Sequence, residues 1–376
     1  MRSTLLAWSV AIALGLGMTT AHAADAVTVK IGQSSPLTGP QAHIGKDNDN
    51  GVRLAIDEIN ATKPTIGGKA VTFEVMSEDD QADPKTATIV AQRMVDEEVA
   101  GVIGHLNSGA TIPASKVYSD NNVPQVSPSA TAIKYTAQGF KTAYRVMTND
   151  EQQGKVLGAY AAKLGKKVAI VDDQTAYGQG LAAEVEKAAK AAGAEVVAVE
   201  HTNDKATDFT AILTSIKGKE PDVIFFGGMD PQGAPMAKQM RQLGIKAQFL
   251  GGDGMQTPKF IELAGADAEG TIASIPGLPL DKMPKGTDFK QKFEAKYGQI
   301  QLYAPYAYDA AYVMVDAMKR ADSTDPEKYL PELAKTSYEG VTGKISFDAK
   351  GDLTSGPITL YTVKGGKWET LETIQP

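Results

Sequence analysis

The sequence contains no cysteine, which excludes disulfide bonds, thiolate metal ligands and a lipid-anchored thiol after a leader segment. It has only four histidines, His22, His43, His105 and His201, and no two of them have the His-x-x-x-His spacing of zinc enzymes. A Gly-x-Ser-x-Gly elbow and a G-x-x-x-x-G-K-[ST] phosphate loop are also absent. These absences remove the common signatures of acyl transfer, metal catalysis and nucleotide hydrolysis.

A dinucleotide cofactor is not expected either. Gly178-Gln179-Gly180 lacks the third glycine of the dinucleotide-binding fingerprint and does not directly follow a predicted strand. The histidines at positions 43, 105 and 201 are interpreted as structural or surface residues. The sequence therefore predicts a protein that is not an enzyme, with no catalytic residues, no metal and no cofactor.

The charge balance limits the partners. A net charge of −7 disfavours electrostatic capture of nucleic acid or of an anionic membrane surface. A hydrophobic fraction of 42% is typical of a globular chain. We expect a small-molecule ligand rather than a nucleic acid.

Long hydrophobic runs are lacking except near the N-terminus. There, one arginine precedes an apolar run from Leu5 to Met18, followed by Ala21-His22-Ala23, the small-x-small pattern of a secretory cleavage site. The run is shorter than the roughly 20 apolar residues of a membrane span. We predict that residues 1–23 form a cleavable signal peptide and that the protein is exported to the periplasm.

Beyond this segment, short apolar runs alternate with amphipathic stretches, a pattern typical of parallel sheets covered by helices. Strands are predicted at 27–33, 71–80, 101–106 and 123–127, with helices at 50–60 and 85–98. The same cadence restarts with strands at 166–173, 194–200, 222–228 and 247–254, and helices at 180–193 and 234–244. Helices at 289–298 and 303–321 follow, then strands in 343–353 and 356–374 with a Gly365-Gly366 hairpin turn.

The predicted fold class is therefore α/β, with two doubly wound parallel-sheet lobes joined by three crossovers and a ligand cleft between them. About 350 residues also exceed what one core usually organises. We assign 24–147 plus 276–353 to lobe 1, and 148–275 plus 354–376 to lobe 2.

Ligands of open α/β sheets bind at the carboxyl ends of the strands. In the first array these ends carry Ser108 and, after the next strand, Ser127-Pro128-Ser129-Ala130-Thr131. Backbone N–H groups and a hydroxyl beside a helix N-terminus suit a carboxylate. Alternatively, Ser108 and Thr131 are ordinary helix N-caps.

In the second array the strand ends carry Met229-Asp230 and Asp253. An Asp between glycines can simply form a turn, but opposite a carboxylate site it would complement an ammonium group. Tyr177 and Tyr303 are candidates for lining the cleft, although aromatic residues more often pack in a core. Carboxylate on one lobe and ammonium on the other describe an α-amino acid.

The chain resembles the periplasmic leucine/isoleucine/valine-binding proteins of ABC importers, which have the type I periplasmic binding fold. The stretches that carry this resemblance are IGQSSPLTGPQAHIG, NGVRLAIDEIN, DDQADPKTA, VIGHLNSGATIPAS, QVSPSATAI, AYGQGL and AEGTIASIP, in order along nearly the whole chain after the leader.

The resemblance implies that Ser108, Ala130 and Thr131 hold the amino-acid head group and that Tyr177 and Asp253 act from the second lobe. Met229 and Ile44 stand where relatives have aromatic wall residues, Asn107 where some have a disulfide cysteine, and Asp253 where a glutamate is usual.

We therefore predict a monomeric binding protein that captures a branched-chain or other aliphatic amino acid by hinge closure and delivers it to an ABC permease. Two alternatives stay open: a protein of the same fold that binds another small acid, such as an aromatic carboxylate, or an amide; and a ligand-sensing module. An exported enzyme is the least favoured. An Asp253 that only caps a turn would favour the first alternative.

Overall fold

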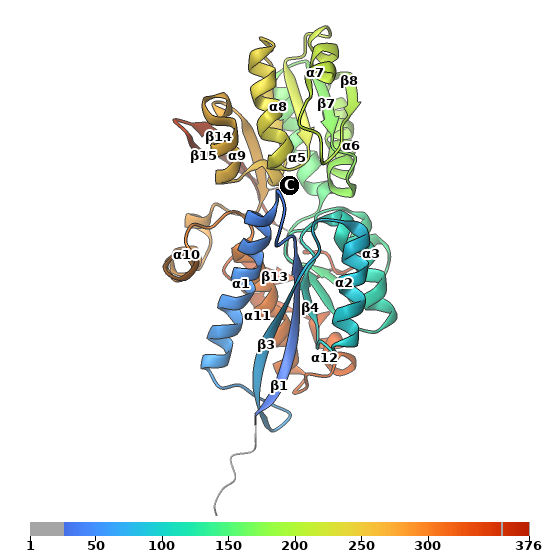
Figure 1. Cartoon of the computed structure of the whole chain (residues 1–376), viewed down its shortest axis with the longest axis vertical. Coiled ribbons are helices and arrows are strands. Elements are labelled where there is room, and N and C mark those ends of the chain that lie inside the picture. The colour runs from blue at the N-terminus through green and yellow to red at the C-terminus, as the bar shows by residue number, and fades with distance from the viewer. Residues whose placement is uncertain (1–25, 355, 376) are drawn as a thin grey trace, which may run out of the picture.

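A computed structural model describes residues 26–354 and 356–375, and the predicted signal peptide lies outside them. The molecule is elongated, with two sheets stacked along its long axis and helices on both faces of each (Figure 1). Among the described residues, no helix combines the length and the apolar character needed to cross a membrane. The predicted fold class, two α/β lobes, is confirmed.

The first sheet has the strand order β2-β3-β1-β4-β5-β6. All neighbours pair in parallel except β2 and β3, which form a hairpin. Helices α1 and α11 cover one face, and α2 and α3 pack together elsewhere on the sheet. The elements are β1 (Val27–Ser35), α1 (Ala42–Ala61), β2 (Thr65–Ile66), β3 (Lys69–Asp79), α2 (Pro84–Asp96), β4 (Val102–Gly104), α3 (Ser108–Asp120), β5 (Gln125–Ser127), α4 (Lys134–Ala137) and β6 (Ala143–Arg145).

The second sheet has the order β15-β14-β11-β10-β9-β7-β8, parallel from β11 to β8 and antiparallel at β14 and β15. Its elements are α5 (Asp150–Leu164), β7 (Lys167–Asp172), α6 (Ala176–Ala191), β8 (Glu195–His201), α7 (Thr210–Lys217), β9 (Val223–Gly227), α8 (Asp230–Gln242), β10 (Gln248–Gly251), η1 (Asp253–Met255), α9 (Pro258–Ala264), η2 (Gly265–Ala268), β11 (Ile272–Pro276), β14 (Ile358–Lys364) and β15 (Lys367–Ile374).

Between β11 and β14 the chain returns to the first sheet, where α11 packs against α1 and β4. These elements are η3 (Leu280–Lys282), α10 (Gly286–Tyr297), α11 (Ala304–Arg320), α12 (Pro326–Leu333), β12 (Ser337–Glu339) and β13 (Lys344–Ser346). Over the described residues the chain thus crosses three times: after β6, after β11 and after β13. Below, residues 26–145 and 280–346 are called the first half, and residues 150–276 and 358–374 the second half. The lobe boundaries at 147/148, 275/276 and 353/354 stay a prediction.

Glycines stand at two chain reversals, and the turn predicted at Gly365-Gly366 is present. Gly193 follows α6 with a φ of +86°, the left-handed conformation that ends helices and that glycine adopts without steric cost. Gly365 and Gly366 also have positive φ and connect β14 to β15 as a hairpin. Local chemistry therefore set these chain reversals.

One sequence expectation is corrected. The strand β5 is not followed by a helix of useful length, because α4 has only four residues and begins at Lys134, three residues beyond Thr131. Thr131 is therefore not a helix N-cap, and of the two helix N-termini predicted after β4 and β5 only that of α3 is present. The sequence predicted two equivalent carboxylate sites, each at a helix N-terminus. The structure has a helix N-terminus at Ser108 and, at residues 127–131, a turn that does not lead directly into a helix.

The two halves meet in one buried hydrophobic cluster. It contains core residues of each sheet, such as Ile103 and Phe225, and also Tyr177 in α6, Met229 before α8 and Tyr303 before α11. Continuous burial across the boundary means that the halves are in contact at the cleft in this structure.

Candidate functional site

Strand ends from both halves meet around a small cavity. Its lining residues are Leu106, Asn107, Ser108, Ser129, Tyr177, Met229, Asp253 and Tyr303. The remaining space is about 10 Å³, room for about one water molecule. Five of the eight residues predicted for the site, Ser108, Tyr177, Met229, Asp253 and Tyr303, are thus brought together from five separate chain segments.

Ser108 supplies the first-half side of this cavity from the first residue of α3. The preceding residue, Asn107, is the N-cap and makes no side-chain bond to the helix; its amide instead donates to Gln41 Oε1 at 2.7 Å. The Ser108 hydroxyl is not a helix cap, because it accepts a hydrogen bond from the Ala132 N–H at 3.1 Å. The uncapped first turn of α3 leaves N–H groups that can bind an anion.

The turn after β5 presents Ser129 to the cavity. Ser129 belongs to the stretch that the sequence placed at a strand end, but it was not among the eight residues predicted for the site. The predicted residues beside it, Ala130 and Thr131, are buried but do not line the cavity. The Ala130 carbonyl accepts a hydrogen bond from Arg145 Nη1 at 2.7 Å, which fixes the turn. The signal that could have found Ser129 is its place at the same strand end, one residue before Ala130.

Asp253 forms the second-half side and is almost completely buried. Its Oδ1 accepts hydrogen bonds from Tyr177 Oη at 2.8 Å and from Gln153 Nε2 at 2.9 Å. Its Oδ2 accepts one from Tyr303 Oη at 2.5 Å, across the boundary between the halves. All three of these partners come from distant segments of the chain, so the carboxylate does not form the local turn that the sequence left open as an alternative.

Burial raises the pKa of Asp253, and the hydrogen bonds from Tyr303, Gln153 and Tyr177 oppose that rise. Burial, together with the charge of Asp253, also holds the pKa of Tyr177 and of Tyr303 well above the usual value, so both hydroxyls act as donors. Three neutral donors and no cation surround this carboxylate among the hydrogen bonds of the described residues. A positively charged ligand group would supply the missing counter-charge.

Glycines on both sides of Asp253 allow the close packing. A Cβ at Gly252 would lie 2.4 Å from Tyr177 Oη, and one at Gly254 would lie 2.4 Å from Met229 Sδ. The Gly254 N–H also donates to Tyr177 Oη at 3.2 Å. The Gly-Asp-Gly sequence therefore positions Tyr177 and Met229 in addition to the acid.

Ile44, the last predicted site residue, lies in α1 and is fully buried in the cluster that joins the halves, but it does not line the cavity. Gln153, from the first turns of α5, was missed by the sequence analysis. Its amide bridges Asp253 and Ser274 Oγ, at 2.9 and 2.8 Å. No pattern in the sequence relates Gln153 to Asp253, which lies 100 residues away.

Asp150, at the start of α5, is a further buried carboxylate near this network. Neither of its oxygens has a hydrogen bond of standard geometry in the described part of the chain. Burial raises its pKa to about 8, an effect that the nearby Thr131 hydroxyl opposes and the charge of Asp253 increases. Asp150 does not line the cavity.

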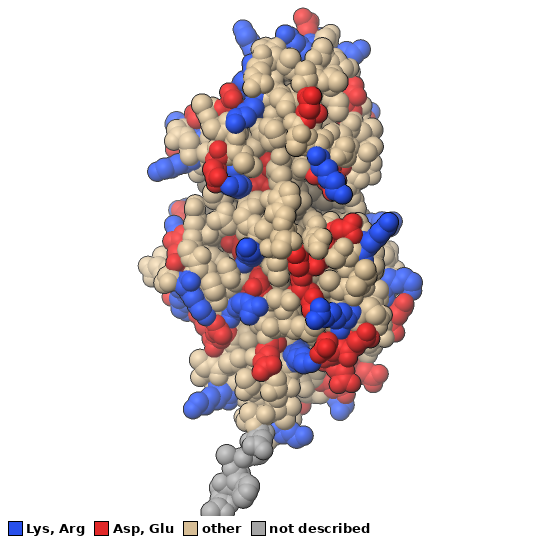
Figure 2. Space-filling model, viewed as in Figure 1, with Lys and Arg blue, Asp and Glu red and all other residues tan. Residues whose placement is uncertain are grey.

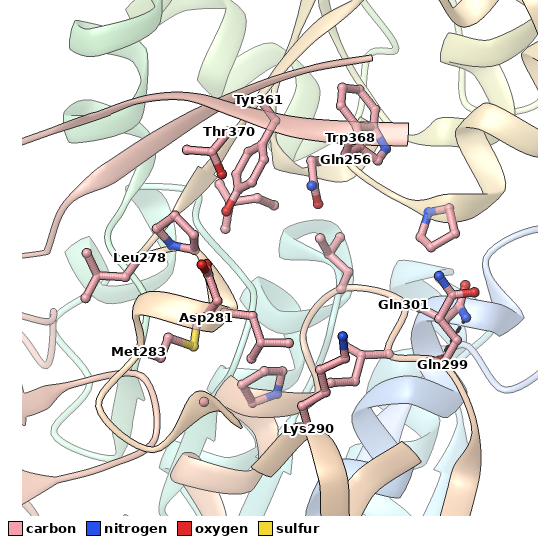
Figure 3. Close-up of a pocket in the computed structure, with 18 of the residues that line it drawn as sticks. Gln256, Leu278, Asp281, Met283, Lys290, Gln299, Gln301, Tyr361, Trp368 and Thr370 are labelled. Atoms are coloured by element: carbon pink, nitrogen blue, oxygen red, sulfur yellow. Dashed lines mark hydrogen bonds between the residues drawn. The ribbon is translucent and has the colours of Figure 1, made fainter. Parts of the chain in front are cut away.

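A larger groove of about 830 Å³ runs along the flank between η3 and α10 on one side and β14, β15 and α9 on the other. Figure 3 shows Leu278, Met283 and Lys290 facing Tyr361 and Trp368 across this space. Its charged side chains, such as Lys290, are exposed to solvent. We assign the candidate ligand site to the small cavity instead, because buried polar groups converge there.

The surface carries no large field of one sign on the face shown in Figure 2, where acidic and basic side chains are interspersed on both halves. That face narrows between the halves.

Comparison with known proteins gives a consistent result. A family model described as "Periplasmic binding protein" matches residues 28–367. The Leu/Ile/Val-binding protein homolog 1 of Brucella melitensis is 35% identical over 345 residues, which cover 91% of this chain and 90% of that protein.

Solved structures share the fold. The branched-chain amino acid transporter substrate-binding protein LivJ from Streptococcus pneumoniae, in complex with isoleucine, matches with a TM-score of 0.83 and 31% identity over 93% of this chain and 100% of that one. A solute-binding protein of an ABC transporter from Rhodopseudomonas palustris, in complex with 3,4-dihydroxybenzoic acid, matches with a TM-score of 0.81 and 23% identity, over 93% and 97% of the two chains. At that identity the second likeness concerns the fold alone.

Proposed function

The chain belongs to the periplasmic binding protein family, whose members are not enzymes, and from this premise we propose that it captures an aliphatic α-amino acid for an ABC importer. It is a substrate-binding protein of the kind that serves ABC transporters. The proposal concerns the ligand, for which a branched-chain amino acid is the first choice.

The observation that carries the proposal is the environment of Asp253. Within the described parts of the chain this buried carboxylate has three neutral donors and no cationic partner, so it is poised for an ammonium group, which would form a charge-assisted hydrogen bond with it. Ser108 and the uncapped N-terminus of α3 lie on the other side of the same cavity and suit a carboxylate. These groups together match a zwitterion.

The apolar lining indicates the side chain of the ligand. Leu106 and Met229 are the aliphatic residues at the cavity. A polar group of the ligand placed against these two side chains would be buried without a hydrogen bond, which costs free energy. The side chain of the ligand is therefore expected to be aliphatic.

Binding must involve movement of the halves. A cavity of about 10 Å³ cannot hold an amino acid, and Tyr303 Oη takes the position on Asp253 that the ammonium group would share. We infer that the halves separate by bending at the three crossing segments, accept the ligand, and close on it. Head groups bound by both halves then supply the greater affinity for the closed form that closure requires.

Export and delivery complete the proposal. Residues 1–23 act as a signal peptide, the protein works as a monomer in the periplasm, and the closed form docks on a membrane permease. Support comes from the pattern of the leader sequence and from the family.

A thermal-shift screen of the purified chain from residue 24 onward tests the function. Leu, Ile and Val are compared with other amino acids, with small aromatic acids and with short amides. A ligand at a hundredfold excess over its Kd stabilises the protein by about 2.7 kcal/mol, so binding gives a clear rise in Tm. We expect the largest rise with a branched-chain amino acid.

The opposite outcome is equally clear. Stabilisation only by acids without an amino group, such as 3,4-dihydroxybenzoic acid, would contradict the role given to Asp253. Isothermal titration calorimetry with leucine and with its desamino analogue then measures how much the ammonium group contributes.

A further inference from the structure

Among the described residues, two hydrogen bonds between one side chain and another join opposite walls of the cleft. One is the bond from Tyr303 to Asp253, inside the candidate site. The other connects His43, near the start of α1 in the first half, to Asp230, the first residue of α8 in the second half, with 2.7 Å between Nε2 and Oδ2. This second contact does not involve the cavity.

The Asp230 side chain is completely buried, and that of His43 is 17% exposed. Asp230 Oδ2 also accepts a hydrogen bond from Thr257 Oγ1 at 2.6 Å, whereas Oδ1 has no partner in the described part of the chain. Among residues 26–354 and 356–375, His43 is the one basic residue whose side chain lies within ion-pair distance of this carboxylate. Oδ2 of this buried carboxylate is therefore shared between one partner from each half.

Both residues are next to candidate wall residues, because His43 precedes Ile44 and Asp230 follows Met229. If the halves separate, the bond breaks and the buried carboxylate becomes exposed to water. A contact present in one conformation and absent in the other shifts the equilibrium between them, even when neither partner touches the ligand.

We propose that His43 and Asp230 form a latch that holds the cleft closed and slows release of the ligand. They are positioning residues, since they act through closure of the halves. The inference rests on the proposed capture of a ligand by closure, but it also predicts a property of the ligand-free protein.

The test uses His43→Ala, with His43→Gln as the variant that keeps a hydrogen-bond donor. Loss of a hydrogen bond to a charged partner predicts a rise in Kd for the amino acid of about tenfold, almost entirely through a faster dissociation rate in stopped-flow measurements. His43→Gln should recover part of this loss. The matched control is His201→Ala, since His201 bonds to Asp172 at the same distance of 2.7 Å but within the second half.

A second measurement reads closure directly. Because the chain has no cysteine, Lys85→Cys and Lys205→Cys introduce two unique sites for spin labels. Both positions are exposed. They lie on facing rims of the cleft, because the positive charge of Lys205 in the second half acts on Asp83 in the first half: it helps to lower the pKa of Asp83, to a smaller extent than the Thr86 N–H does. In the ligand-free protein, His43→Ala should shift the distance distribution toward longer separations, whereas His201→Ala should not.

Unchanged distances together with an unchanged dissociation rate in His43→Ala would overturn the latch. If the wild-type protein binds no amino acid but the distances still lengthen in His43→Ala, the proposed ligand is wrong and the latch stands. If amino acids bind and neither property changes, the ligand stands and the latch is wrong. Thermal unfolding of His43→Ala at the wild-type temperature would exclude misfolding as the cause of any change.

Discussion

The two walls of the cleft differ in their chemistry although both are built from the carboxyl ends of parallel strands. The first-half wall presents hydroxyls and backbone N–H groups, from Ser108, Ser129 and the start of α3. The second-half wall presents carboxylates, Asp253 in the cavity and Asp230 beside it. The same fold thus forms one wall that suits an anion and another that suits a cation.

This asymmetry has a physical basis in what each wall must satisfy. Helix α3 begins without a side-chain cap, so its first N–H groups depend on another partner. Asp253 is buried among neutral donors, so its negative charge is only partly compensated. A zwitterion placed between the walls satisfies both, whereas an anion without an ammonium group satisfies one and leaves the other.

The largest effect is expected from removing the charge of the second wall. Asp253→Asn should weaken amino-acid binding about a hundredfold or more, because truncating a buried charge pair costs about 2–5 kcal/mol. The variant should lose the preference of the wild type for leucine over its desamino analogue. Isothermal titration calorimetry of both ligands with both proteins gives this double comparison.

The control for Asp253 is Asp173→Asn. Asp173 is also a buried acid of the second half, and burial raises its pKa to about 6, but it does not line the cavity. The affinity of the Asp173→Asn variant for leucine should equal that of the wild type. Equal losses in the two variants would mean that the asymmetry of the walls does not determine binding.

The second prediction concerns the proton held by Asp150, the buried carboxyl group at the start of α5 in the second half. Its folded pKa of about 8 lies above the unfolded value, so the folded state binds the proton more tightly. The stability associated with this proton is complete at pH below about 4 and is lost as pH rises toward 8.

The variant Asp150→Asn has no carboxyl group to titrate, so it does not lose this stability as pH rises. The difference in free energy of unfolding between the variant and the wild type should therefore increase by up to about 1.4 kcal/mol per pH unit, or about 2 kcal/mol between pH 5 and 6.5. Urea unfolding of both proteins at several pH values measures the difference. Asp208→Asn, an exposed acid whose pKa is lowered by the Thr210 hydroxyl and N–H, should show a constant difference above pH 5. A constant difference for Asp150→Asn as well would contradict the predicted protonation.

The smallest effect is expected in the first wall. Ser108→Ala should weaken leucine binding about fivefold to tenfold, since one hydrogen bond contributes about 1 kcal/mol and backbone N–H groups of α3 stay in place. The desamino analogue should lose affinity by the same factor, because both ligands carry the carboxylate. The control is Ser119→Ala, at the other end of the same helix. If Ser108→Ala lost affinity for leucine but not for the desamino analogue, the Ser108 hydroxyl would instead bind the ammonium group.

Much of the fold follows from local patterns. The alternation of apolar runs with amphipathic stretches predicted both arrays, and the glycines at 365 and 366 marked a chain reversal that the structure contains. The helix after β5 was overestimated, because the turn at Ser127–Thr131 is held by Arg145 and by Ser127 Oγ rather than by helical bonds. Side-chain bonds between distant segments leave no periodic trace in a sequence.

The candidate site shows the same division. Residue types at strand ends pointed to Ser108, Met229 and Asp253, because the ends of neighbouring parallel strands must lie at one edge of a sheet. Gln153 and Ser129 were missed, and Ile44, selected by resemblance, is buried in the core instead of lining the cavity.

The sequence by itself determined the two α/β arrays and the chemical character of their strand ends, since periodicity and turn residues act over short stretches of chain. Only the tertiary structure decided that Tyr303 donates to Asp253 and that His43 bonds to Asp230, 187 residues away. The reason is that three chain crossings bring the halves together, and the distance between residues on opposite walls depends on the packing of both sheets rather than on any local preference.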